Sequence, residues 1–461
     1  MLRQMIAFCV LALAACSSQP AEAPTADAGP VALYEGALLI AGDGTAPIAD
    51  SAFLVENDTI TQVGRRGDVS APEGAARVDL SGKTVMPTII NTHGHPGFQR
   101  GLSYTKDNYT RETIMEDMNR LLYFGIAAVQ SHGIEIGTIM DEVRADQQAG
   151  RLGGAYVLIA GRGIGTPNAG PGGAAYAGIA YELTTEDEGR QAVQELAAKS
   201  VDLVKIWVDD RNGRAPRLPP NIYRAIIDEA HGRGMRVSAH VFYHDDAVDL
   251  VNAGIDGFAH LVRDREMDDA LIASIVQRNV YVMPNISERA TYAELPPWLM
   301  PGDPLNSLIE ASVPAAVVDR IRMSYEGRDP AVVDARRERY AILQRSTAKL
   351  AEANANLILG SDTGLRDHLF GVAEQRELDN MVRAGMTPMQ VIVAATSRAA
   401  EFLKLDRMGT LAPGKEADFL VLDANPLDAI TNTQRISSVY MKGTEVDRAA
   451  LAASLRTVTS N

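Results

Sequence analysis

Two histidines flank a glycine at the end of an apolar run, in the stretch TIINTHGH at residues 88–95. Side chains two positions apart on a β-strand point to the same face, so the imidazoles of His93 and His95 are expected to lie side by side. Imidazole is the commonest protein ligand of divalent metal ions. Short His-X-His pairs also arise by chance, so a metal site needs further ligands elsewhere in the chain.

Four more residues of suitable chemistry occur in apolar, strand-like runs. They are Lys205 in DLVKIWV, His240 in RVSAHVF, His260 in GFAHLV and Asp362 in LILGSDTG. Taken singly, each has an ordinary interpretation, because a strand histidine can be a hydrogen-bonded core residue, a lysine can extend to the surface and an aspartate can cap a turn. Taken together, four imidazoles and a carboxylate suit zinc or a similar divalent ion.

The elements that would carry these residues alternate between strand and helix from Pro87 onward. Strand–helix alternation of this length predicts a parallel sheet, and eight strand-like runs predict a closed (β/α)₈ TIM barrel over residues 87–407. In that fold the carboxyl ends of the strands face one common site, which would bring the six residues together. An open doubly wound sheet is the alternative, but no glycine-rich phosphate loop follows the first strand.

The segments on either side of the predicted barrel have a different texture. Residues 31–86 and 408–461 contain short β-type runs between turn residues. We therefore expect one discontinuous β-sandwich domain that is built from both segments, with a C-terminal tail. Residues 287–335 look irregular and rich in proline, and we expect them to cover part of the site as a lid; a passive surface excursion is the alternative.

The chain begins with a basic residue, an apolar stretch and the sequence LAAC, which ends at Cys16. The apolar stretch is too short to span a bilayer and has the pattern of an export signal. LAAC resembles a bacterial lipoprotein processing site, so we expect a signal peptide at residues 1–16, lipidation of Cys16 and a flexible tether at 17–30. The alternative is an ordinary cleaved signal with a chance cysteine. The expected location is the cell envelope, on the periplasmic face of the outer membrane.

Composition limits the partners. The 461 residues carry a net charge of −15 without a basic run, which argues against nucleic-acid binding. The only cysteines, Cys9 and Cys16, lie in the leader, so the mature chain has neither a disulfide nor a thiolate ligand. The expected partners are a small-molecule substrate and the membrane, through the lipid anchor; homo-oligomer formation is left open.

Several stretches, in this order and spacing, resemble the metal-dependent amidohydrolase superfamily. The likeness is greatest to the imidazolonepropionase-related branch, which includes Xaa-Pro dipeptidases and N-acyl amino acid hydrolases. It runs from about Val31 to Met441, and the matching stretches are GKTVMPTIINTHGH, VDLVKIWV, IIDEAHGRGMRVSAHV, AVDLVNAGIDGFAHL, LILGSDTG, MTPMQVIVAATSRAAEFL and MGTLAPGKEADFLVLDANPLDAI. The family usually has glycine and aspartate where Thr88 and Asn91 stand.

The resemblance implies two divalent ions, with zinc expected, and a carboxylated lysine at Lys205 that bridges them. An ammonium group beside such ions would be unfavourable, whereas a carbamate is an anion. By the same resemblance, one ion is bound by His93, His95 and Asp362, and the other by His240 and His260. His132, which ends the second strand, and His368, in the loop after Asp362, are candidates for the substrate pocket.

The implied reaction is hydrolysis of an amide C–N bond in a dipeptide, an Xaa-Pro peptide or an N-acyl amino acid. A hydroxide that bridges the metals would attack, and Asp362 would act first as general base and then as general acid. Three alternatives remain. They are a lactonase or phosphotriesterase with the same metals, a cyclic amide or imidazolone ring hydrolase or deaminase with one metal, and a barrel without metals that serves as a binding protein. Lys205 argues against the one-metal reaction.

Overall fold

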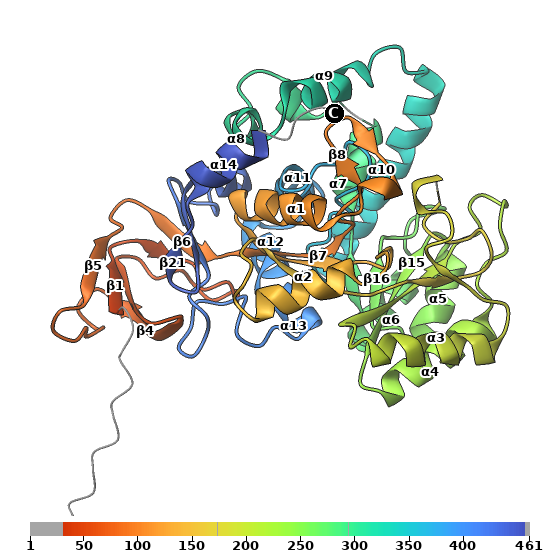
Figure 1. Cartoon of the computed structure of the whole chain (residues 1–461), viewed down its shortest axis with the longest axis horizontal. Helices are drawn as coiled ribbons and strands as arrows, with labels where there is room; N and C mark the ends of the chain where they lie inside the picture. The colour runs from red at the N-terminus through yellow and green to blue at the C-terminus, as the bar shows by residue number, and fades with distance from the viewer. Residues whose placement is uncertain (1–30, 173, 294, 457–461) are drawn as a thin grey trace, which may run out of the picture.

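The structure is a computed structural model that describes residues 31–172, 174–293 and 295–456 (Figure 1). The expected signal peptide at 1–16, Cys16 and the tether at 17–30 therefore lie outside the described residues. Among the described residues, no helix is both long and apolar enough to cross a membrane. The molecule consists of a barrel of strands ringed by helices and a smaller all-β unit at one side.

Eight parallel strands of the described chain form the barrel. In order around it they are β7 (Ile89–Gly94), β10 (Ile126–Ser131), β11 (Tyr156–Leu158), β14 (Leu203–Val208), β15 (Arg236–Val241), β16 (Gly257–Ala259), β17 (Tyr281–Met283) and β18 (Asn356–Leu357). Two backbone hydrogen bonds close the ring, from Asp202 N to Ile159 O (2.8 Å) and from Thr92 N to Leu359 O (2.9 Å). The predicted α/β fold class with a TIM barrel is confirmed.

Helices follow each strand and cover the outside of the barrel (Figure 1). They are α1 (Arg111–Tyr123), α2 (Ile139–Gln148), α3 (Glu186–Ala198), α4 (Pro220–Gly232), α5 (His244–Asn252) and α6 (Asp269–Gln277), with α11 (Val372–Arg383), α12 (Pro388–Ala395) and α13 (Ser397–Leu403) after the last strand. Their starts follow the local sequence: the Thr185 side chain, for example, accepts a hydrogen bond from Glu188 N in a capping box. Short elements in the loops are β8 (Gln99–Arg100), β9 (Ser103–Tyr104), β12 (Ile164–Gly165), β13 (Tyr181–Glu182), η1 (Lys106–Asn108) and η2 (Ala174–Tyr176).

The smaller unit is a sandwich of two sheets. One sheet has the order β4-β3-β1-β5 and the other β2-β6-β19-β20-β21. The strands are β1 (Val31–Glu35), β2 (Leu38–Leu39), β3 (Ser51–Glu56), β4 (Thr59–Arg65), β5 (Ala76–Asp79), β6 (Thr84–Pro87), β19 (Phe419–Leu422), β20 (Ile436–Met441) and β21 (Thr444–Glu445), with η4 (Ile430–Gln434) between β19 and β20. Because β6 pairs antiparallel with β19, the two ends of the chain share one sheet, and the unit is discontinuous in sequence.

The prediction that residues 287–335 are irregular is wrong. The region contains α7 (Ile286–Ala293), η3 (Pro297–Leu299), α8 (Leu305–Ser312), α9 (Ala315–Met323) and the start of α10 (Pro330–Glu352). The prolines that suggested a loop stand instead at helix starts, with Pro304 and Pro314 as N-caps and Pro330 in the first turn, where a missing N–H costs nothing.

This helical insertion lies beside the loops that follow other strands of the barrel (Figure 1). Arg320 of α9 donates a hydrogen bond to Leu102 O, in the loop after β7, and pairs with Asp367, in the loop after β18. The tail contains a further helix that the sequence analysis did not predict, α14 (Arg448–Arg456), which packs against α1 and α8. The insertion is therefore tied to the loops of the barrel and to the C-terminal helix.

Candidate metal centre

Six side chains that the sequence singled out meet at the carboxyl end of the barrel. His93 and His95 come from the end of β7, Lys205 from β14, His240 from β15, His260 from the residue after β16 and Asp362 from the segment after β18. All six are buried and line one pocket. The parallel barrel accounts for this convergence, because every strand ends at the same face.

The shortest contacts within the group are made by the Asp362 carboxylate. Its Oδ1 lies 3.0 Å from His95 Nε2 and 3.3 Å from His93 Nε2, and its Oδ2 lies 3.8 Å from His260 Nε2. One ligand atom each from His93, His260 and Asp362 lie within 4.8 Å of one another. These atoms are close enough to share one small cation.

Two of these residues have unusual backbone conformations. Asp362 has φ of 56° and His260 has φ of 96°, both in the left-handed region that non-glycine residues rarely occupy. Such a conformation costs on the order of 1–3 kcal/mol and persists only where the surroundings impose it. Hydrogen bonds from Asp362 N to His93 O (3.0 Å) and from His260 N to Met283 O (3.1 Å) hold the two segments in place.

Lys205 is buried among these groups without a hydrogen-bond partner for Nζ, and its side chain is 1% exposed. Nζ lies 5.7 Å from the centre of the Trp207 ring. Burial lowers the pKa of Lys205 to about 7, with Asp362 acting in the opposite direction and Arg211 and Arg263 adding to the lowering. A buried amine without a partner is costly unless another group completes its environment.

Three imidazoles of this pocket, those of His93, His240 and His260, are held neutral. Burial, followed by the neighbouring histidines and Lys205, puts the pKa of His93 well below its usual value. Burial likewise depresses the pKa of His260 and of His240. Neutral imidazole is the form that binds metal ions, so the pocket favours ligation over protonation.

The carboxylate of Asp362 stays ionised. Burial alone would raise the pKa of Asp362, but the hydrogen bond with His95 and the charges of His95 and Lys205 lower it to about 2. On the opposite side of the pocket, Asp209 Oδ2 lies 3.0 Å from His240 Nε2. That contact fixes the orientation of the His240 ring, as carboxylates that hydrogen-bond to histidine ligands do in metal sites.

A buried polar network supports the histidine pair from below. Asn91 Nδ2 donates to Glu374 Oε1 (2.6 Å) and to Ser361 Oγ (3.0 Å), and Asn91 Oδ1 accepts from His93 N (3.0 Å). Glu374 of α11 thus brings a carboxyl group next to Asn91, where the family usually has aspartate. Burial raises the pKa of Glu374 to about 7.

The sequence analysis missed this role of α11. The stretch VAEQRELDNMVR has the composition of an exposed helix, yet Glu374 and Glu377 are fully buried. Glu377 accepts hydrogen bonds from Ile286 N (2.9 Å) and Ser287 N (2.6 Å), and so caps the start of α7. The signal available in the sequence was only the position of the helix, directly after Asp362.

Neither His132 nor His368, the two candidates for the substrate pocket, is among the described residues that line the six-residue pocket. The His132 ring packs beside His93, with 4.2 Å between ring centres, and its Nε2 lies 3.0 Å from Ser238 Oγ. His368 Nε2 donates to Ser361 O (2.9 Å).

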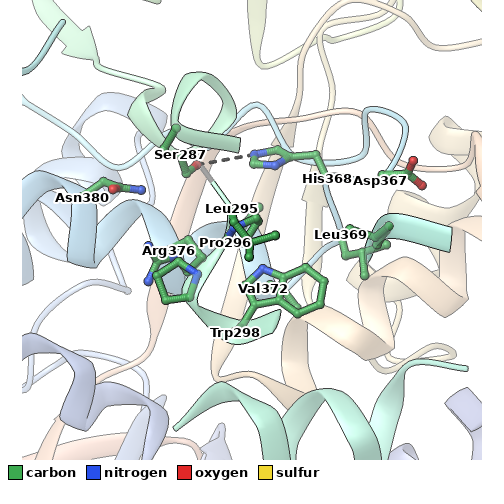
Figure 2. Close-up of a pocket in the computed structure, with 14 residues that line it drawn as sticks. Ser287, Leu295, Pro296, Trp298, Asp367, His368, Leu369, Val372, Arg376 and Asn380 are labelled. Carbon is green, nitrogen blue, oxygen red and sulfur yellow. Dashed lines mark hydrogen bonds between the residues drawn. The ribbon is translucent and has the colours of Figure 1, made fainter. Parts of the chain in front are cut away.

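His368 faces a second, separate pocket, in which Figure 2 shows it hydrogen-bonded to Ser287 (3.4 Å) above Trp298 and Pro296. This second pocket lies between α7, η3 and α9 of the insertion on one side and α11 on the other.

Other residues of the metal pocket were not singled out in the sequence. Ile134, Pro171, Tyr176, Trp207 and Leu365 give it apolar or aromatic walls, and Arg211, Glu288 and Arg289 give it charged ones. Arg211 belongs to the stretch VDDRNGR after β14, whose run of charged residues directly after a buried strand was the available signal.

The comparison with protein families identifies the chain. A model of the amidohydrolase family matches residues 84–446, which is most of the sequence. The chain belongs to the amidohydrolase family. As an amidohydrolase it is a hydrolase that acts on carbon–nitrogen bonds.

Similar proteins span nearly the same length as this amidohydrolase. An uncharacterized protein of Mycobacterium tuberculosis is 28% identical over 81% of this chain and 88% of its own. A 5-methylthioadenosine/S-adenosylhomocysteine deaminase of Symbiobacterium thermophilum is 26% identical over 85% of each chain. The crystal structure of a Xaa-Pro dipeptidase with bound methionine in the active site is 20% identical, has a TM-score of 0.73 and covers 90% of this chain and 99% of its own.

The residues of this amidohydrolase fit the divalent ions that the family uses. The donors are imidazoles, an ionised carboxylate and a buried lysine amine without a protein hydrogen-bond partner, which suits borderline divalent ions such as zinc. His93, His260 and Asp362 are within reach of a shared ion, and His95 Nε2 lies 3.0 Å from Asp362 Oδ1. His240 lies next to His260, with 4.6 Å between ring centres. A second position beside Lys205 would use His240 and His260.

Proposed function

We propose that this amidohydrolase cleaves the amide C–N bond of a dipeptide, an Xaa-Pro peptide or an N-acyl amino acid with two bound divalent ions, zinc being the expected one. The observation that carries the proposal is Lys205. Its Nζ is buried beside Asp362 and the histidines and lacks a hydrogen-bond partner. The Xaa-Pro dipeptidase of the same fold supports the substrate class.

Lys205 is suited to carboxylation. A pKa near 7 leaves a substantial share of neutral amine, whose lone pair can add to the carbon of carbon dioxide with release of one proton. The resulting carbamate is an anion with two oxygen donors. It would replace an unpaired amine by a ligand for both ions, which removes the conflict between an ammonium group and bound cations.

The chain's own residues then organise hydrolysis. Bound divalent ions would polarise the substrate carbonyl and lower the pKa of a water molecule. Asp362, which is ionised and lies within hydrogen-bond distance of His95, accepts a proton from the attacking water and delivers it to the leaving nitrogen. Asp209 holds the His240 ring, and Asn91 with Glu374 holds the backbone of His93.

Deamination is the second candidate, because the deaminase from Symbiobacterium thermophilum is similar over most of the chain. One-metal relatives of that kind generally lack a lysine at the position of Lys205. The burial of Lys205 within the pocket therefore favours the two-metal amide hydrolase over the deaminase.

A panel assay of the purified chain tests the proposal. It measures kcat/KM for N-acyl amino acids, Xaa-Pro dipeptides, lactones, organophosphate triesters and 5-methylthioadenosine, with Asp362→Asn as the inactive control. We expect an N-acyl amino acid or a dipeptide to have the highest value. If lactones, triesters or the nucleoside exceed it by orders of magnitude, the amide assignment is wrong.

We also propose that the enzyme is anchored in the cell envelope through a lipidated Cys16. The support is the sequence alone, an apolar export signal that ends in LAAC. Fractionation of cells that express the full chain tests this. The wild-type protein is expected in the membrane fraction and Cys16→Ser in another fraction, whereas the same distribution for both would contradict the anchor.

A further inference from the structure

Arg211 lines the metal pocket and is held in place from two sides. Its Nη1 donates to Asp209 Oδ2 (3.3 Å), and its backbone N donates to Asp209 Oδ1 (2.9 Å). Its Nη2 donates to Gly170 O, and a Cβ at Gly172 would lie 3.8 Å from Arg211 Nε. The side chain is 20% exposed. A cation that is fixed in this way, at the edge of a buried site, is already oriented for a ligand.

The Arg211 guanidinium has N–H groups that donate no hydrogen bond within the described residues. Arginine carries five N–H groups, and the two side-chain bonds to Asp209 and Gly170 leave others unused. Arg211 Nε has no hydrogen-bond partner. Burial is the main cause that lowers the pKa of Arg211, with Asp209 opposing it, and the group nevertheless stays charged at neutral pH.

The charge of Arg211 is also incompletely balanced. Its partner Asp209 is shared with His240, whose Nε2 lies 3.0 Å from the same Oδ2. Arg263 adds a further buried cation, with Nη2 3.2 Å from His240 Nε2. By contrast, Arg289 on the pocket wall forms an ion pair with Glu288 at 2.6 Å. Arg211 therefore has the greater need of an additional anion.

A second donor lies in the same pocket. Tyr176 lines it and is 8% exposed, and its hydroxyl has no hydrogen-bond partner. The Tyr176 ring is fixed by Phe98, with 5.0 Å between ring centres. The remaining walls are mainly apolar, so the pocket combines a cation and a hydroxyl with a surface for a hydrocarbon group.

We propose that Arg211, assisted by the Tyr176 hydroxyl, binds a free carboxylate of the substrate next to an apolar side chain. The inference rests on the proposed function and assigns residues to the carboxylate that N-acyl amino acids and dipeptides with a free C-terminus carry. The planar fork of a guanidinium matches the two oxygens of a carboxylate. Arg211 would therefore select among amides and leave the bond-breaking chemistry to the metal centre.

Two probes without a cleavable bond test the inference independently of turnover. They are 3-phenylpropionate and 3-phenylpropanol, which share the hydrocarbon part and differ in the carboxylate. Binding to the metal-loaded enzyme is measured by calorimetry for the wild type, Arg211→Met, Arg211→Lys, Tyr176→Phe and the exposed control Arg214→Met. Arg214 lies on the same loop, and its Nε bonds only to Arg211 O.

We expect the wild type to bind 3-phenylpropionate at least tenfold more tightly than the alcohol. Arg211→Met should weaken the carboxylate about 10- to 100-fold and leave the alcohol unchanged, because a hydrogen bond to a charged group is lost. Arg211→Lys should recover part of the affinity, Tyr176→Phe should lose a few-fold, and Arg214→Met should match the wild type.

Three results would overturn the inference. They are no preference of the wild type for the carboxylate, equal carboxylate affinity in Arg211→Met and the wild type, or equal weakening of both probes, which would mark Arg211 as only a brace for the loop at Gly170. If Arg211→Met does not fold, the wild-type preference and Arg211→Lys decide. A wild type that binds the carboxylate through Arg211 but cleaves no amide would contradict the proposed function and leave this inference standing.

Discussion

The carboxyl end of the barrel and the core of the sandwich both bury a cluster of rings about 5 Å apart, yet they do so by opposite means. In the sandwich the rings are those of phenylalanine and tyrosine: Tyr34 stacks on Phe53 at 4.9 Å, and Phe419 stacks on Tyr440 at 4.4 Å. Edge-to-face contact of Phe53 with Phe419 at 5.2 Å joins the two pairs. Packing alone stabilises such a cluster, because the buried atoms are largely apolar.

At the barrel end the rings are imidazoles, and packing leaves their chemistry incomplete. His240 and His260 lie 4.6 Å apart, and His93 and His260 lie 5.1 Å apart. Several features of this end lower the stability of the fold. They are the buried polar nitrogens of the rings, the buried amine of Lys205 and the left-handed backbone of His260. The sandwich therefore contributes free energy of folding, and part of this free energy offsets the cost of the reactive groups at the barrel end.

The largest expected effect comes from the amine of the barrel end. Lys205→Met should lower kcat/KM about 10³-fold or more, because the proposed carbamate could no longer form, and should lower the metal content per chain. The melting temperature of the variant should not fall, because an unpaired buried amine is replaced by an apolar side chain. The exposed Lys199→Met is the matched control. Wild-type turnover in Lys205→Met would show that the buried amine is not needed for the reaction.

The converse substitution lies in the sandwich. Phe419→Ala should lower the free energy of unfolding by about 3–5 kcal/mol, because a fully buried ring is removed. Urea unfolding measures the loss, and kcat/KM per folded molecule should match the wild type. Val332→Ala, at an exposed site on α10, should change neither quantity. A fall in the kcat/KM of folded molecules would show that the sandwich takes part in the reaction.

An intermediate effect is expected at Gly94, between the two histidines of β7. A Cβ there would lie 2.8 Å from Val129 Cγ2 and 3.1 Å from Thr363 Cγ2, so the strand would have to move away from its neighbours. Gly94→Ala should weaken metal affinity about 10-fold, as small shifts of ligand positions do. Metal titration of the depleted protein measures it, with Gly153→Ala, at an open position, as the control. Unchanged affinity would mean that the ligand positions tolerate this shift.

The smallest effect is expected at Asp418, a buried carboxyl group of the sandwich. Burial raises the pKa of Asp418 to about 7 from an ordinary value of 3.8, although Lys442 N donates to it. The unfolded chain loses this proton first as pH rises, so the contribution of Asp418 to stability falls between about pH 4 and pH 7 and stays low above.

Asp418→Asn should therefore unfold at a higher temperature than the wild type at pH 8 and with little difference at pH 4. Thermal scans at both pH values measure this, with the exposed Asp428→Asn as the control. An equal change at both pH values would assign the effect to packing instead of titration.

Regular patterns made the fold and the ligand candidates predictable. Alternation of apolar strands and amphipathic helices indicated the barrel, and the ligand candidates stood on or directly after β7, β14, β15, β16 and β18, at positions that parallel topology brings to one face.

Features that depend on distant partners were not predictable. Glu374 and Glu377 look like surface residues until α11 is placed against β7 and α7. The prolines of the insertion indicated a loop, but they start helices whose apolar faces are covered only in the folded chain. Arg211 became a candidate only when Asp209 and Gly170 were seen to hold it at the pocket.

The central claim is that the buried groups of the barrel end are ligands of divalent ions that the reaction requires. The most direct test removes the metal with a chelator, dialyses the chelator away and follows turnover of the best amide substrate while zinc is added back. We predict loss of at least 99% of activity, a folded apoprotein and recovery that is complete near two equivalents per chain. Full turnover by the metal-free enzyme would contradict the account.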